Sequence, residues 1–177
     1  MDKKIFSILL SSCLLCSCGE DSIKEKERST DVGAEITSRV QEFHTADTTL
    51  NAQGVISLLW PEYTMMADGK LVTYEQVKTG APDFMESLET FYTEWHNLKV
   101  IPLGNDHAIS TFTFHDSIVT KDGLITLSTG PNTFIWEKRD TVWKVIFADA
   151  DHYPVTRDST ASMHHQNKRN TPFPEKH

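Results

Sequence analysis

The chain has 177 residues, of which 38% are hydrophobic and 10% aromatic, which is enough to bury the core of one domain. Its formal net charge is −8, with 17 basic against 25 acidic residues and no conspicuous basic run. Because an acidic chain repels phosphate backbones, this balance argues against a nucleic-acid partner.

The N-terminal segment, residues 1–17, has the pattern of a secretory signal. Lys3 and Lys4 provide a basic start, and an apolar run follows over residues 5–15. That run is too short to cross a bilayer as a helix. A basic start, a short apolar middle and small residues before a cut are typical of signal peptides, so we expect residues 1–17 to be removed.

All three cysteines of the chain, Cys13, Cys16 and Cys18, lie close to this signal. A metal or redox site would need cysteines held by a folded frame with further ligands nearby, and a hydrophobic leader offers neither. The stretch LCSC instead resembles the lipobox of bacterial lipoproteins. The resemblance implies that Cys18 is acylated and anchors the mature protein to a lipid bilayer of the bacterial cell envelope, facing the periplasm or the cell surface. The stretch LSSC, which ends at Cys13, is an alternative processing site.

A charged segment, residues 18–30, comes next and is nearly free of apolar side chains, which predicts a solvated tether. A helix is then expected from Asp31, because apolar residues recur every three or four positions. The apolar face of this helix consists of Val32, Ile36, Val40 and Phe43. A second helix is expected over residues 48–59 and a third over residues 74–88, where the stretch TYEQ predicts a capping box.

The periodicity then changes from helical to strand-like. The expected strands cover residues 91–101, 106–120, 124–138 and 141–153. Gly130-Pro131 interrupts the third of them and predicts a bulge. Helices followed by a meander indicate an α+β fold, in which three N-terminal helices pack on a strongly curved antiparallel β-sheet that forms a cone with an internal pocket. Residues 154–177 are polar and predict a disordered tail.

Three stretches of the chain resemble one known family. They are WPEYTMMADGKLVTYEQV, LGNDHAISTFTFHDSIVTKDG and TFIWEKRDTVWKVIFADADHYP. They are similar to segments of the nuclear transport factor 2-like superfamily, in its SnoaL-like branch with a cystatin-like cone, over residues 31–153. The resemblance implies this fold and a homodimer formed through the sheet. Many members have histidines where this chain has Phe147 and Asp149, so roles tied to those histidines are not carried over.

The last expected strand holds the candidate catalytic residues. Because side chains alternate along a strand, Trp143, Val145, Phe147, Asp149 and Asp151 are expected to share one face. A carboxylate among aromatic rings is poorly solvated, so its pKa rises and it suits a general acid or base. Asp149 is the first candidate and Asp151 the second, and the resemblance to SnoaL-like cyclases and ketosteroid isomerases implies such a role. The alternative is that both aspartates only cap the end of the strand.

Further residues are expected to line the pocket and to bind a ligand there. They are Tyr63, Trp95, Phe112, His115, Phe134, Trp136 and Phe147. A metal site is not expected, because alternation places His152 on the face opposite Asp149 and Asp151, and no cofactor motif is found.

Three functions remain open at this point. The first is a membrane-tethered domain that binds a small, largely apolar ligand, or a partner, in its cone. The second is a cofactor-independent isomerase, dehydratase or cyclase, and the third is a dimeric scaffold with a filled cone. The first is favoured, because the sequence shows no nucleophile–base pair and no phosphate-binding loop.

Overall fold

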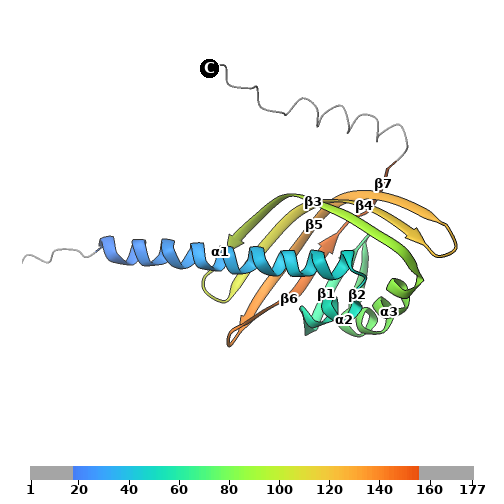
Figure 1. Cartoon of the computed structure of the whole chain (residues 1–177). Helices are drawn as coiled ribbons and strands as arrows, with labels where there is room; N and C mark the ends of the chain where they lie inside the picture. The colour runs from blue at the N-terminus through green and yellow to red at the C-terminus, as the bar shows by residue number, and fades with distance from the viewer. Residues whose placement is uncertain (1–17, 156–177) are drawn as a thin grey trace, which may run out of the picture.

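The computed structural model describes residues 18–155 and has the expected α+β architecture. The helices are α1 (Cys18–Thr48), α2 (Ala52–Ser57) and α3 (Tyr74–Ser87). The strands are β1 (Leu59–Ala67), β2 (Lys70–Thr73), β3 (Leu88–Pro102), β4 (His107–Thr120), β5 (Ile125–Arg139), β6 (Val142–Ala150) and β7 (Tyr153–Pro154). They form one sheet in the order β2-β1-β6-β5-β4-β3, with β7 paired to β5. Figure 1 shows a strongly curved sheet with α1 running across it and α2 and α3 beside β1 and β2.

The first helix is longer than the sequence pattern indicated. It begins at Cys18 rather than at Asp31, so the segment expected to be a flexible tether is helical. The glutamates, lysines and arginine of this segment have high intrinsic helix propensity and extend a helix whose later turns are fixed by packing. In Figure 1 the N-terminal part of α1 extends beyond the sheet. None of the helices that the structure describes is long and apolar enough to cross a membrane.

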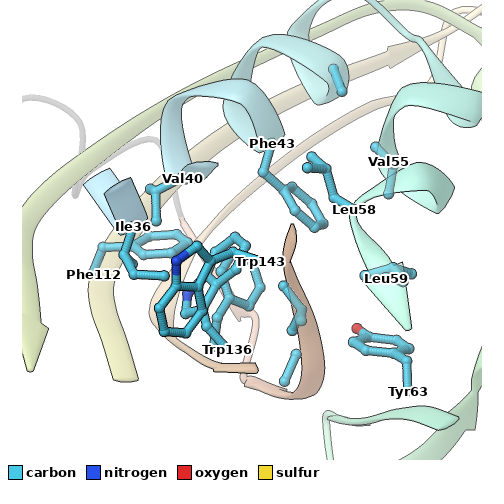
Figure 2. Packing of buried hydrophobic residues seen from close by; sticks show 14 of the residues in the cluster. Ile36, Val40, Phe43, Val55, Leu58, Leu59, Tyr63, Phe112, Trp136 and Trp143 are labelled. Atoms are coloured by element: carbon cyan, nitrogen blue, oxygen red, sulfur yellow. The ribbon is translucent and has the colours of Figure 1, made fainter. Parts of the chain in front are cut away.

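The apolar face of α1 packs onto the concave side of the sheet, as Figure 2 shows. Trp136 of β5 and Trp143 of β6 are completely or almost completely buried beneath Ile36. Each indole has a partner for its N–H group: Trp136 donates to Ser110 Oγ at 2.9 Å, and Trp143 donates to the carboxylate of Glu35. Side chains therefore fill this end of the cone.

One pair of strands departs from the expected antiparallel meander. β1 runs parallel to β6, so the sheet is mixed. β1 can pair in parallel with β6 because most of the domain lies between them in the chain, whereas strands joined by a tight hairpin are antiparallel. β1 turns back into β2 through Asp68 and Gly69, whose φ angles of 51° and 74° are those of a two-residue hairpin turn.

The predicted bulge at Gly130-Pro131 is wrong. The pairing of β4 with β5 continues there without a shift, with Phe114 opposite Gly130. The glycine is needed for a different reason: a Cβ atom at this position would lie 1.7 Å from the carbonyl oxygen of Asp151. Gly130 therefore lets the chain that leaves β6 pass directly over β5.

The bulge lies instead in β6, at Ile146. Trp136 pairs with Val145 and Ile135 with Phe147, so Ile146 is an extra residue without a partner on β5. The hairpin that joins these strands turns at Asp140 and Thr141, one residue later than expected. Because side chains alternate, the extra residue reverses the face of every position that follows it in β6.

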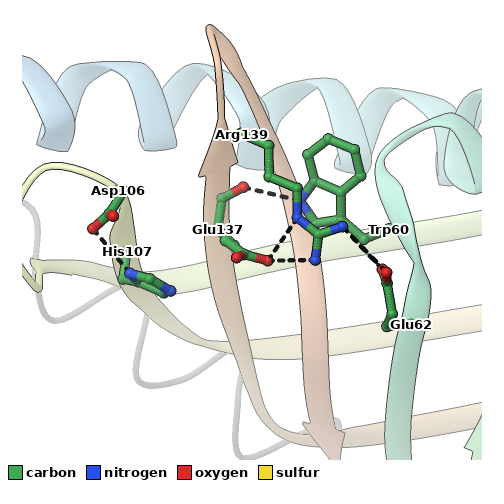
Figure 3. Close-up of polar contacts among 6 residues, drawn as sticks. All are labelled: Trp60, Glu62, Asp106, His107, Glu137 and Arg139. Atoms are coloured by element: carbon green, nitrogen blue, oxygen red, sulfur yellow. Dashed lines mark hydrogen bonds and ion pairs between the residues drawn. The ribbon is translucent and has the colours of Figure 1, made fainter.

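A cluster of polar and aromatic side chains connects β1 to the β5–β6 hairpin, as Figure 3 shows. The Arg139 guanidinium lies 4.5 Å from the ring centre of Trp60 and pairs with Glu137 at 2.8 Å and Glu62 at 3.1 Å. The indole N–H of Trp60 donates to the carbonyl oxygen of Glu137 at 3.0 Å. These contacts reach across β6 and hold the start of β1, where its pairing with β6 is irregular.

The chain is still part of the sheet where the polar tail was expected to begin. Pro154 pairs with Ser128, and the amide of Val155 donates to the carbonyl oxygen of Leu127 at 3.0 Å. The predicted signal peptide and the rest of the predicted tail lie outside the described residues.

The Gly130→Ala variant is expected to destabilise the domain. The new methyl group meets a backbone carbonyl, which cannot rotate away as a side chain can, so the free energy of unfolding should fall by at least about 2 kcal/mol. The matched control is Gly80→Ala in α3, where nothing lies within 4 Å of the added atom and the better helix propensity should add about 0.5–1 kcal/mol. Urea denaturation measures both, and equal stability of Gly130→Ala and the parent would contradict the close approach.

Candidate functional site

The end of the cone away from the two tryptophans is hollow. A cavity of about 310 Å³ lies between the C-terminal end of α1, the helix α3 and the concave face of the sheet. This volume is within the range of small-molecule sites. Most of its wall is apolar, and the phenylalanine and tryptophan side chains in it are Phe43, Phe84, Phe91, Trp95, Phe112, Phe114 and Phe134. Its polar side chains are Asp47, Tyr63, Asp116, Asn132 and His152.

The aromatic wall is built from rings packed on one another across the strands. Trp95 of β3 stacks on Phe112 of β4 with 4.1 Å between ring centres. Phe134 of β5 meets Phe112 edge-on at 5.4 Å and lies 4.9 Å from Phe43 of α1. Each ring holds its neighbour in place, so this wall is preformed.

Asp47 extends the apolar face of α1 by one further turn, four residues after Phe43. It keeps some accessible surface, as a residue that lines a cavity does. Burial, and to a smaller degree the negative charge of Asp116, raise the pKa of Asp47 to about 8. At neutral pH this carboxyl group therefore holds its proton most of the time and can donate a hydrogen bond.

Asp116 continues the inward-facing series of β4 that includes Phe112 and Phe114. Burial raises its pKa, while the Thr93 hydroxyl and the nearby histidines oppose this rise. Thr93 is directly opposite on β3 but outside hydrogen-bond geometry. One carboxylate oxygen of Asp116 is consequently buried without a partner.

Two further polar side chains complete this end of the cavity. Tyr63 of β1 is buried, and burial together with the charge of Asp47 raises the pKa of its phenol, which therefore stays a hydrogen-bond donor. Asn132 of β5 has a buried amide oxygen without a partner. In the part of the chain that the structure describes, the unpartnered buried side-chain atoms are those of Asn132, Asp116 and Thr93. Buried polar atoms are normally hydrogen-bonded, so the oxygens of Asp116 and Asn132, which line the cavity, are suited to receive hydrogen bonds from a bound molecule.

His152 lies at the rim of the cavity, two residues after Ala150. Its backbone N–H donates to Asp68 Oδ1 at 2.7 Å, and its ring nitrogen Nδ1 lies 3.2 Å from the same oxygen. These bonds, the backbone bond first, lower the pKa of Asp68. The imidazole also packs 4.9 Å from Phe114, so it connects the β1–β2 turn to the aromatic wall.

The predicted catalytic aspartates are not in the cavity. Asp149 is exposed on the outer face of the sheet, because the extra residue Ile146 reverses the alternation that follows it. Ala150 takes the inward place instead. Asp151 is partly buried and accepts a weak hydrogen bond from Tyr153 at 3.4 Å, outside the residues that line the cavity.

The expected ligand-binding residues divide into two groups. Those placed in the cavity wall are Tyr63, Trp95, Phe112 and Phe134. Trp136 is instead part of the filled core, and Phe147 is on the outer face for the same reason as Asp149. His115 also faces outward, with its ring 5.1 Å from that of His96, because the inward positions of β4 are the even-numbered ones.

Sequence reasoning missed the two carboxyl groups that do enter the cavity, although a signal for both was present. Asp47 falls at the next position of the helical series that ends at Phe43, and Asp116 at the next position of the strand series that ends at Phe114. A carboxyl group that continues an apolar stripe has to be either buried or at its edge. In the described part of the chain, no three His, Cys, Asp or Glu side chains are grouped so that they could hold a metal ion.

Comparison with solved structures identifies the fold. A nuclear transport factor 2-like superfamily protein from Salmonella enterica has a TM-score of 0.63 at 17% identity, covering 72% of this chain and 94% of its own. A ketosteroid isomerase-like protein from Erwinia carotovora has a TM-score of 0.59 at 15% identity, covering 70% and 97%. A hexachlorocyclohexane dehydrochlorinase has a TM-score of 0.59 at 14% identity, covering 72% and 94%. The expected nuclear transport factor 2-like fold is therefore confirmed, whereas identities this low say nothing about activity. No protein-family model matches the chain, and no curated protein sequence does.

The Asp47→Asn variant is expected to change how stability depends on pH. The pKa of Asp47 rises from 3.8 to about 8 on folding, so between these pH values the folded state holds a proton that the unfolded chain has lost. The stability that protonated Asp47 contributes to the folded state is fully present below about pH 4 and is lost progressively as the pH rises to about 8. Asparagine carries no such proton, so the variant should lose less stability over this range, by up to a few kcal/mol.

Urea denaturation of the parent and of Asp47→Asn at several pH values tests this. The control is Asp149→Asn, which removes an exposed carboxyl group on the outer face and should follow the parent. Parallel curves for the parent and Asp47→Asn would show that Asp47 titrates as an ordinary aspartate.

Proposed function

We propose that this domain binds a small, largely apolar molecule in the hollow end of its cone. The observation that carries the proposal is the composition of the cavity: a packed aromatic wall meets a polar end at Asp47, Asp116 and Asn132, and the last two each have a buried oxygen atom without a partner. An apolar pocket with a few convergent polar groups is typical of small-molecule sites. The apolar body of a ligand would lie against Trp95 and Phe112, and its polar end would complete the hydrogen bonds.

The cavity also bears on the scaffold alternative. A scaffold with a filled cone needs no such space, and side chains fill only the end around Trp136 and Trp143. A homodimer through the outer face of the sheet remains a prediction from the family resemblance and is compatible with a ligand inside the cone.

A second candidate, favoured by the pKa of Asp47, is a cofactor-independent enzyme that moves a proton. A carboxyl group with a pKa of about 8 is protonated often enough to act as an acid and ionised often enough to act as a base near neutral pH. Tyr63 could donate a hydrogen bond to an oxygen atom on which negative charge develops. Such groups would suit an isomerase, dehydratase or cyclase. This candidate replaces the one based on Asp149, which lies outside the cone.

Native mass spectrometry of the protein purified from a bacterial host tests both candidates. We expect a co-purified small molecule, which should be lost in Ala81→Trp because this residue of α3 lines the cavity and the larger ring would occupy it. Asp149→Asn should retain the molecule. An enzyme would convert the identified molecule, and Asp47→Asn would bind it but lower turnover by about 10²–10⁴, whereas a binding module would return it unchanged. Equal retention of the molecule by Ala81→Trp would place its site elsewhere.

We further propose that the domain is tethered to a membrane of the bacterial cell envelope through an acylated Cys18. The basis is the sequence of the leader, in which a basic start and a short apolar run precede LCSC. A second hydrophobic contact beyond the acyl chains is not provided by the charged residues 18–30, so anchoring should depend on the lipid.

Metabolic labelling with a radioactive fatty acid, followed by membrane fractionation, tests the anchor. Cys18→Ser should abolish both labelling and membrane association, and the matched control Cys13→Ser should keep both. The reverse result would assign processing to Cys13, and absence of the label from the parent protein would rule out a lipid anchor.

A further inference from the structure

The charges around the cavity restrict the chemistry of its ligand. Two carboxyl groups, Asp47 and Asp116, line it, and among the described lining residues there is no lysine or arginine. The one basic side chain is that of His152, which lies at the rim and is already engaged with Asp68. A ligand that brought a negative charge into this space would meet two acids without a compensating cation, and its burial would be strongly unfavourable.

We propose that the cavity takes an organic cation, a molecule with an apolar body and a protonated amine. This inference rests on the proposed function and names the class of its ligand. The ammonium group would lie between Asp47 and Asp116, and the apolar body would lie against the rings of β3, β4 and β5.

The unpartnered atoms at the polar end support an N–H donor. Asp116 Oδ1 and Asn132 Oδ1 are both acceptors on residues that line the cavity. Behind Asp116, the buried Thr93 on the neighbouring strand also has an unpartnered hydroxyl. A protonated amine carries up to three donors and no acceptor, so it matches the unsatisfied oxygens of Asp116 and Asn132 and the carboxyl group of Asp47 better than a carbonyl or carboxyl group could. Hydrogen bonds between an ammonium group and a carboxylate are also stronger than those between neutral groups.

The aromatic wall supports a positive charge as well. The faces of aromatic rings carry partial negative charge and attract cations within about 6 Å, and this attraction is larger where water is excluded. Trp95 and Phe112 stack at the wall of the cavity, and Phe134 and Phe114 flank them. Aromatic rings combined with carboxylates form the usual surroundings of a buried ammonium group.

A bound cation would also remove the repulsion between the two acids. The negative charge of Asp116 disfavours the ionised form of Asp47, and Tyr63, whose pKa is raised by Asp47, lines the same cavity. The charges of His152 and His115 in turn lower the pKa of Asp116, against the larger rise caused by burial. A cation between the carboxyl groups favours the ionised form of both, so its binding should release a proton from Asp47 near neutral pH.

Three probes of nearly the same size separate the possibilities: phenethylamine, which is protonated at neutral pH, 2-phenylethanol, which is neutral, and phenylacetate, which is an anion. Binding to the full chain is measured at pH 7.5 by calorimetry and by quenching of tryptophan fluorescence. We expect phenethylamine to bind at least about tenfold more tightly than 2-phenylethanol, and phenylacetate to bind more weakly than both. Calorimetry in buffers of different ionisation enthalpy should show release of a proton with the amine and not with the alcohol.

Two Asp→Asn variants, which keep the shape of the side chain, test which carboxyl group produces the preference for the amine. Asp116→Asn should bring the affinity for phenethylamine close to that for 2-phenylethanol, and unchanged binding of the alcohol shows that this variant is folded. Asp149→Asn removes one negative charge from the outer face and should leave the tenfold preference intact, which separates the site from general attraction to an acidic protein.

The outcomes distinguish this inference from the proposed function. If 2-phenylethanol or phenylacetate binds as tightly as the amine, the cation inference is wrong and small-molecule binding stands. If the preference for the amine survives Asp116→Asn, the cation binds elsewhere and the inference is also wrong. If none of the three probes binds, the cavity is not a site for small apolar molecules, and the proposed function and the inference are both wrong.

Discussion

The packing of one helical stripe into a curved sheet is the contact on which the rest of this structure depends. Ile36, Val40 and Phe43 of α1 cover the concave face and, with Trp136 and Trp143, fill one end of the cone. The apolar stripe stops before the helix does, and the next position on the same face is Asp47. The core therefore ends, and the cavity begins, at the point where the stripe changes from hydrocarbon to a carboxyl group. The place and the polarity of the cavity both follow from this change.

The sequence predicted the framework well because the framework follows local periodicity. The four long strands and the capped helix α3 were expected from alternation and from the stretch TYEQ, and all are present. Of the aromatic residues that line the cavity on β3, β4 and β5, Trp95, Phe112 and Phe134 were expected there, whereas Phe91 and Phe114 were not. Extended helix at residues 18–30 was missed, since charge suggested a solvated tether where helix propensity prevailed.

The site itself was predicted less well, and one residue accounts for much of the error. Ile146 has no partner on β5, so the inward series of β6 passes from Val145 to Ala148, and Asp149 falls outside. A bulge of this kind depends on pairing with both neighbouring strands, and no composition or spacing within β6 reveals it. The two acids that do enter the cavity were overlooked for a different reason. Their apolar series were ended at the last hydrocarbon side chain rather than followed one position further.

The early start of α1 has a mechanical consequence. Residues 18–30 continue, without a break, the helix that packs on the sheet, and they add about 20 Å of length at 1.5 Å per residue. A flexible linker would let a domain tumble freely about its attachment point. A continuous helix is stiffer than such a linker. If the proposed anchor at Cys18 holds, the same helix that shapes the cone would therefore fix both the distance of the domain from the membrane and its orientation.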